Sequence, residues 1–170
     1  MPRVFFAVWP DQAAAEALSD AATAAQATCG GRTMRLETLH LTLAFLGDLP
    51  VARVDAAKRI ADGVTAASFD LVLDQLGYWR HNRILWASGG VPAGLTFIAG
   101  SLQRDLRAAG FALDARAFAP HVTLLRDAHC ADTPTLAQPI RWPVREFVLA
   151  ESRLSSAGAR YDIIGRWPLP

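Results

Sequence analysis

The sequence His40-Leu41-Thr42-Leu43 in the first half of the chain returns as His121-Val122-Thr123-Leu124 in the second half. Polar and aliphatic residues alternate in both stretches, which is the pattern of a β-strand with one buried face. Neighbouring side chains on a strand point to opposite faces, so the histidine and the threonine of each stretch share one face. Each stretch is therefore predicted to bury its aliphatic side and to present an imidazole and a hydroxyl group on the other.

The surroundings of the two stretches repeat as well, because in each half a helix that ends at glycine precedes an irregular segment and then the His-x-Thr strand. Capping residues, strong helix formers and the spacing of leucines predict three helices, over about 11–27, 51–64 and 92–109. Alternating, β-branched and aromatic runs predict strands over 4–9, 39–46, 69–76, 84–88, 121–126, 145–154 and 161–167. The pattern predicts an α+β fold built from a duplicated unit.

Composition limits the class of protein. Hydrophobic residues make up 52% of the 170 residues and charged residues 19%, which favours a compact globule over a disordered chain. The length suits one domain over 1–170, made of two small lobes that share an interface. The net charge of +1 does not require a polyanionic partner, so any contact with nucleic acid is expected to be local. The apolar run 3–9 is too short for a signal peptide or a membrane span, and a cytoplasmic, monomeric protein is expected.

The two cysteines, Cys29 and Cys130, have no partner at metal-ligand or redox spacing. We expect them to be reduced thiols. Carboxylates and histidines also form no cluster with metal-ligand spacing, so neither a metal nor another cofactor is expected. His129 follows the second motif in a polar segment, and no role is assigned to it.

Two imidazoles and two hydroxyls on converging strands suit the cleavage of a phosphodiester without a metal. One neutral imidazole takes a proton from the attacking water, while a second, protonated imidazole gives a proton to the leaving oxygen. Thr42 and Thr123 would donate hydrogen bonds to the non-bridging oxygens as charge develops there. Arg126 would add a charge-assisted hydrogen bond, but strand parity places it on the face opposite His121 unless the strand twists or ends there.

The segments 37–47 and 118–126, which contain these motifs, resemble the two signature motifs of the 2H phosphoesterase superfamily. Within it, they resemble the RNA 2′,3′-cyclic phosphodiesterase branch, historically called 2′-5′ RNA ligase. The segments 3–8, 84–87 and 151–161 are similar to that branch too, so the resemblance covers nearly the whole chain. It implies two lobes related by a pseudo-twofold axis, each an antiparallel sheet with helices on its outer face, and a cleft between them.

The same resemblance implies a function without metal, namely hydrolysis of a 2′,3′-cyclic phosphate at an RNA or nucleotide end to a 2′-phosphate. His40 would be the proton donor to the 3′ oxygen and His121 the proton acceptor from water, with Thr42, Thr123 and Arg126 holding the phosphate. Two alternatives stay open: ligation in the reverse direction by the same histidines, and a module that binds RNA ends or nucleotides without turnover. The physiological RNA is not defined by the sequence.

The segment 77–83 departs from the Pro-rich, Arg-containing turn that is usual in that branch. Tyr78 or Trp79 would stack on a base and Arg80, His81 or Arg83 would touch an RNA backbone, or the segment is a solvated hairpin tip. The same choice applies to Arg32 and Arg35, which either line the mouth of the cleft or face solvent. Phe45 shares parity with Leu41 and Leu43, so it is expected to pack in the core.

Overall fold

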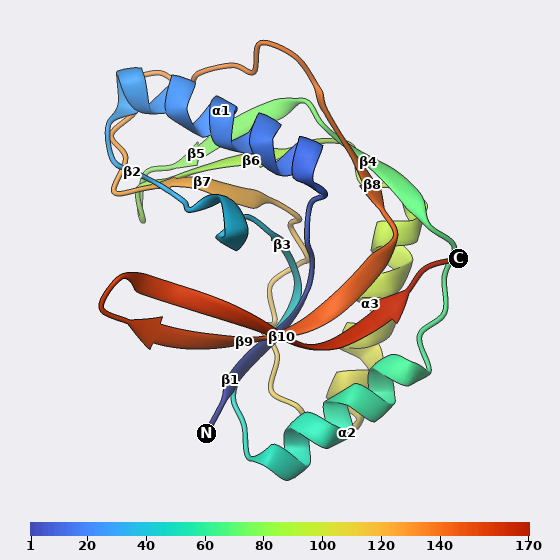
Figure 1. Cartoon of the computed structure of the whole chain (residues 1–170). Coiled ribbons are helices and arrows are strands. Elements are labelled where there is room, and N and C mark those ends of the chain that lie inside the picture. Colours follow the sequence, from blue (N-terminus) through green and yellow to red (C-terminus); the bar gives the residue numbers. More distant parts are fainter.

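The computed structural model describes all 170 residues, and its three helices lie where the sequence predicts them (Figure 1). They are α1 (Gln12–Cys29), α2 (Val51–Asp62) and α3 (Ala93–Ala108), and a short 3₁₀ helix, η1 (Leu36–Thr38), precedes the first motif. The side chain of Asp11 caps α1 by accepting a hydrogen bond from the backbone N–H of Ala14. No helix is both long and apolar enough to cross a membrane.

Most strands form one large antiparallel sheet in the order β10-β9-β1-β3-β7-β6-β5, with β2 paired to β7, and β4 and β8 form a separate pair. The strands are β1 (Arg3–Val8), β2 (Arg32–Thr33), β3 (Leu41–Asp48), β4 (Phe69–Leu73), β5 (Gln75–Trp79), β6 (Ile84–Ser88), β7 (Val122–Arg126), β8 (Ile140–Val144), β9 (Glu146–Ser155) and β10 (Gly158–Pro168). The expected strand over 69–76 is thus split between two sheets.

The two halves of the large sheet meet at the His-x-Thr strands. β3 and β7 pair through a single residue pair, Leu41 with Val122, which are the middle residues of the two motifs. On one side of this junction lie β1, β9 and β10, and on the other lie β6 and β5 (Figure 1). The junction therefore joins two lobes and places both motifs at their boundary.

Each lobe is covered by a helix from the other half of the sequence. Helix α1 precedes β3 in the chain but packs against β7 and β2, whereas α3 precedes β7 but packs against β3. Figure 1 shows α1 along the β5-β6-β7 lobe and α2 and α3 along the other lobe. The buried apolar side chains form one main cluster that extends through both lobes. The predicted α+β fold is confirmed, and its two lobes are intertwined.

Cys29 and Cys130 form a disulfide, so the expectation of two reduced thiols was wrong. Cys29 ends α1, and Cys130 lies in the segment that follows β7, with their Cα atoms 4.5 Å apart. The packing of α1 on β7 brings these ends together, as does the hydrogen bond from the His129 N–H to the Cys29 carbonyl oxygen (2.8 Å). Sequence spacing does not reveal this pairing because it depends on the crossed packing of the helices.

Candidate active site

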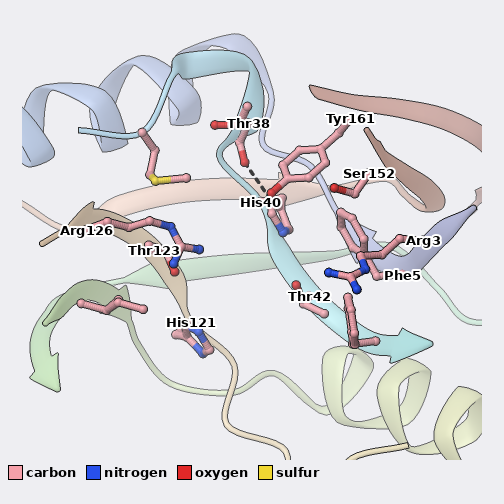
Figure 2. Close-up of a pocket in the computed structure, with 13 residues that line it drawn as sticks. Arg3, Phe5, Thr38, His40, Thr42, His121, Thr123, Arg126, Ser152 and Tyr161 are labelled. Carbon is pink, nitrogen blue, oxygen red and sulfur yellow. Dashed lines mark hydrogen bonds between the residues drawn. The ribbon is translucent and has the colours of Figure 1, made fainter. Parts of the chain in front are cut away.

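A pocket of about 360 Å³ at the junction of the lobes is lined by all five residues that the sequence singles out. Figure 2 shows His40 and Thr42 facing His121, Thr123 and Arg126 across one space. The full lining consists of Arg3, Phe5, Met34, Thr38, His40, Thr42, Phe45, Ile84, His121, Thr123, Arg126, Ser152 and Tyr161.

The two histidines are held in the same way. Nδ1 of His40 lies 2.7 Å from the carbonyl oxygen of Thr38, in a hydrogen bond that Figure 2 marks with a dashed line. Nδ1 of His121 lies 2.7 Å from the carbonyl oxygen of Ala119. A carbonyl oxygen only accepts, so Nδ1 carries a proton and donates it in both hydrogen bonds. The nitrogen that takes up or releases a proton is therefore Nε2 in each ring.

The pairing of Leu41 with Val122 also sets the relation between the motifs. The pairing is antiparallel and joins only this residue pair, which has the histidine on one side of it and the threonine on the other in each motif. All four side chains line the same pocket. One phosphate in this pocket is within the reach of groups from both lobes.

Arg126 reaches the pocket because β7 contains a β-bulge. Along β6, Trp86 pairs with Thr123 and the preceding Leu85 pairs with Leu125, which leaves Leu124 as an extra residue. The extra residue reverses the alternation, so Leu124 and Leu125 are both buried and Arg126 shares the pocket with Thr123. The twist that strand parity required is thus supplied by this bulge.

The first motif contains the equivalent bulge, which corrects the expectation for Phe45. Ala7 pairs with Thr42 and Phe6 with Ala44, so Leu43 is the extra residue of β3. Phe45 is turned out of the core by this shift, is 51% exposed and lines the pocket. The expected core position of Phe45 was wrong for the same reason that Arg126 reaches the site.

Arg126 forms no ion pair, whereas the neighbouring arginines do. Arg32, which pairs with Arg126 in the β2–β7 ladder, contacts Asp127 at 3.0 Å, and Arg83 contacts the other oxygen of Asp127 at 3.4 Å. The guanidinium of Arg126 is therefore available to an anion in the pocket. Gly31 permits this arrangement, because a Cβ at this position would collide with the carbonyl oxygen of Arg126. The φ of Gly31 is +82°, a backbone conformation that other residues rarely adopt.

Other candidate arginines do not line the pocket. Arg35 donates to the carbonyl oxygen of Ala159 and contacts Glu37 at 3.7 Å. In the segment 77–83, the Tyr78 hydroxyl donates to the Ala128 carbonyl oxygen at 2.6 Å, and Arg80 donates to that of Ala131. These contacts tie the segment to the loop after β7.

A second cavity of about 570 Å³ adjoins the first and shares Thr42, Phe45 and His121 with it. Trp79 and Phe118 add further aromatic surface to its wall. It also contains polar side chains; His81, Asn82, Gln103, Asp114 and Arg116 are among its lining residues.

His40 is half-buried, and aromatic side chains surround its ring. Its ring packs with those of Trp9, Phe5 and Tyr161. Burial lowers the pKa of His40 from 6.5 to about 4; its hydrogen bond to Thr38 opposes this change, and the charges of His121 and Arg126 add to it. In the unliganded protein this imidazole is therefore neutral at pH 7.

Several pocket residues were not predicted, among them Arg3, Thr38, Ser152 and Tyr161. They come from β1, η1, β9 and β10, in segments that resemble the 2H phosphoesterases, but the resemblance assigned these residues no role. Arg3 is paired with Asp48 at 3.0 Å. No three side chains of histidine, cysteine, aspartate or glutamate are grouped so as to hold a metal ion.

This fold and site define a phosphoesterase that carries two His-x-Thr motifs. Residues 8–86 match the model of the LigT-like phosphoesterases. The RNA 2′,3′-cyclic phosphodiesterase of Escherichia coli K12 is 35% identical over 143 residues, which cover 82% of this chain and 80% of the relative. The chain belongs to the LigT-like phosphoesterase family of the 2H superfamily.

Solved structures agree with this assignment. Apo Escherichia coli LigT superposes with a TM-score of 0.90 at 32% identity, covering 99% of this chain and 97% of the other. The same protein complexed with 3′-AMP superposes with a TM-score of 0.88 at 33% identity over 99% of both chains.

Proposed function

We propose that this chain hydrolyses the 2′,3′-cyclic phosphate at RNA ends and leaves a 2′-phosphate. The observation that carries the proposal is that two Nε2 atoms, two threonine side chains and an unpaired arginine surround one pocket. Relatives named RNA 2′,3′-cyclic phosphodiesterase and the 3′-AMP complex of Escherichia coli LigT support this choice of substrate.

In the proposed reaction, water attacks phosphorus and the bond from phosphorus to the 3′ oxygen breaks. His121 accepts the proton of the water at Nε2, and His40 donates a proton from Nε2 to the 3′ oxygen. The threonine hydroxyls and Arg126 donate to the non-bridging oxygens, where negative charge increases in the transition state. Each turnover moves one proton from His40 to the leaving oxygen and one from water to His121, and proton exchange with solvent then returns both rings to their starting states.

His40 must gain a proton before it acts as the acid. Its pKa of about 4 belongs to the unliganded pocket, where Arg126 and His121 oppose a further positive charge. A bound phosphodiester anion offsets the positive charge of Arg126 and raises the pKa of His40. Substrate binding and protonation of His40 are coupled in this proposal.

RNA or a nucleotide with a 2′,3′-cyclic phosphate is the proposed partner, and no metal takes part. We further propose a single-domain monomer in the cytoplasm; light scattering during gel filtration and cell fractionation test these two points.

The test is to incubate the protein with EDTA and an oligonucleotide that ends in a 2′,3′-cyclic phosphate, and to identify the product by ³¹P NMR. A 2′-phosphomonoester that forms equally fast with and without EDTA is expected. A 3′-phosphate, loss of activity with EDTA, or binding without turnover would each contradict the proposal. An added 5′-hydroxyl oligonucleotide reveals ligation as a longer product.

A further inference from the structure

The two histidines of the pocket differ in their aromatic neighbours. The indole of Trp9 stacks on the His40 ring, with the centroids 4.8 Å apart and the planes 18° from parallel. Tyr161 meets the His40 ring edge-on at 5.2 Å, and Phe5 lies 5.0 Å away. His121 has no stacked ring, because its neighbour Trp79 meets it edge-on, at 4.7 Å and 73°. Of the two histidines, only His40 therefore has an aromatic ring stacked nearly parallel to its own.

Trp9 is fixed by the same short helix that fixes His40. Its Nε1 donates to the carbonyl oxygen of Glu37 at 3.0 Å, and the next carbonyl, that of Thr38, accepts from Nδ1 of His40. Both residues are in η1. Consecutive carbonyl groups thus hold the indole and the imidazole against each other. Trp9 itself is not among the residues that line the pocket.

We propose that Trp9 is a positioning residue for His40, covering one face of the imidazole and holding its Nε2 toward the reacting phosphate. Two rigid partners, a hydrogen bond at Nδ1 and a stacked ring, restrict both the rotation and the tilt of the imidazole. Catalysis by a positioned acid depends on such restriction, since small displacements of the reacting groups are costly. The expected effect on catalysis rests on the proposed function, in which His40 is the proton donor.

The cover has an electrostatic consequence as well. A stacked indole attracts an imidazolium, which raises the pKa, but it also excludes water, which lowers the pKa. Desolvation by the surrounding protein is the largest influence on the pKa of His40, so we expect removal of the indole to raise this pKa. The other titratable or charged groups that line the pocket around His40 are His121 and Arg126 from β7, Arg3 from β1 and Tyr161 from β10. Of these, Tyr161 also packs edge-on against Trp9, with the ring centroids 5.9 Å apart.

The experiment compares Trp9→Leu, which removes the ring, with Trp9→Phe, which keeps a ring but lacks the indole N–H. NMR titration of the His40 ring in the unliganded proteins should show its pKa rising from about 4 toward 6.5 in Trp9→Leu, and less in Trp9→Phe. With substrate, kcat should fall about 10- to 100-fold in Trp9→Leu with little change in KM. In Trp9→Phe, kcat should stay much closer to that of the unchanged protein. If Trp9→Leu does not fold, Trp9→Met fills much of the space without a ring.

Trp167→Phe is the matched control, because Trp167 also stacks on a ring, that of Phe147, and donates its Nε1 hydrogen to Asp62. It does not line the pocket and should leave kcat and the His40 titration unchanged. An unchanged titration and kcat in a folded ring-less variant would overturn the inference. The titration needs no substrate, so it separates this inference from the proposed function.

Discussion

Phe45 and Arg126 occupy equivalent places in the two halves, each five residues after its histidine and each lining the same pocket. The five residues that end at Phe45 and the five that end at Arg126 have the same sequence of buried and exposed positions. A bulge at Leu43 and another at Leu124 produce this pattern. The duplicated unit thus presents a guanidinium from one lobe and an aromatic ring from the other.

Replacing Arg126 by alanine should weaken the binding of phosphate. A hydrogen bond to a charged group contributes about 1.5–3 kcal/mol, which corresponds to about a 10- to 150-fold increase in Kd. Isothermal titration calorimetry with inorganic phosphate or a 2′-nucleotide measures this Kd. Arg32→Ala is the control, since Arg32 is the ladder partner of Arg126 but is paired with Asp127 outside the pocket. Equal losses in both variants would show that net charge, not Arg126, attracts the anion.

Replacing Phe45 by alanine should raise KM for an oligonucleotide while stability changes little. Stacking of a base on an aromatic side chain contributes about 1–3 kcal/mol, or about a 5- to 150-fold change in KM. Half of the side chain is already exposed, so little core contact is lost. Leu154→Ala, at a position that is 89% exposed and outside the pocket, is the control. An unchanged KM would mean that the base lies elsewhere.

The pH dependence of kcat/KM should show an unusually acidic lower limb. A two-histidine mechanism requires one ring protonated and one neutral, and kcat/KM reports the pKa values of the free enzyme. The rate should therefore rise with pH through the pKa of His40, about 4, where that ring loses its charge, and should fall again at higher pH once neither ring is cationic, which gives a bell-shaped profile. Either assignment of acid and base gives this shape. A lower limb near 6.5 would contradict the buried environment of His40.

The disulfide should contribute substantially to stability, because it joins residues 101 positions apart. Constraint of the unfolded chain by a loop of about 100 residues is worth about 4–5 kcal/mol in the entropy model. Urea unfolding with and without dithiothreitol measures this difference, and Cys130→Ser should be insensitive to the reductant. Thiol titration of the unfolded, unreduced protein should detect no free thiol; two free thiols would show that the bond is absent.

Local patterns predicted much of the fold. Asp11 marks the start of α1, and leucines at helical spacing mark α3, because capping and periodicity are properties of neighbouring residues. The pattern predicts no strand over Ile140–Val144, where Pro143 argues against a central strand; this strand, β8, forms a two-stranded pair with β4, where a proline is tolerated.

The site was predicted as far as strand alternation holds. His40, Thr42, His121 and Thr123 follow it, whereas the positions beyond the bulges do not. A bulge depends on how a strand pairs with its neighbour, which is β1 for β3 and β6 for β7. This pairing cannot be inferred from the sequence of the bulged strand alone. The exposure of Phe45 and the way in which Arg126, already named from the sequence, reaches the pocket therefore required the tertiary structure, as did the pairing of the cysteines.

The central claim, that His40 and His121 act together on one phosphate, is tested most directly by a double-mutant cycle. The kcat/KM for a 2′,3′-cyclic phosphate end is measured for His40→Ala, His121→Ala and the double variant, with circular dichroism as the control for folding. Groups that act as a unit are strongly non-additive. We predict a loss of at least about 100-fold in each single variant and no further loss in the double variant. Losses that multiply, or activity retained in either single variant, would contradict the account.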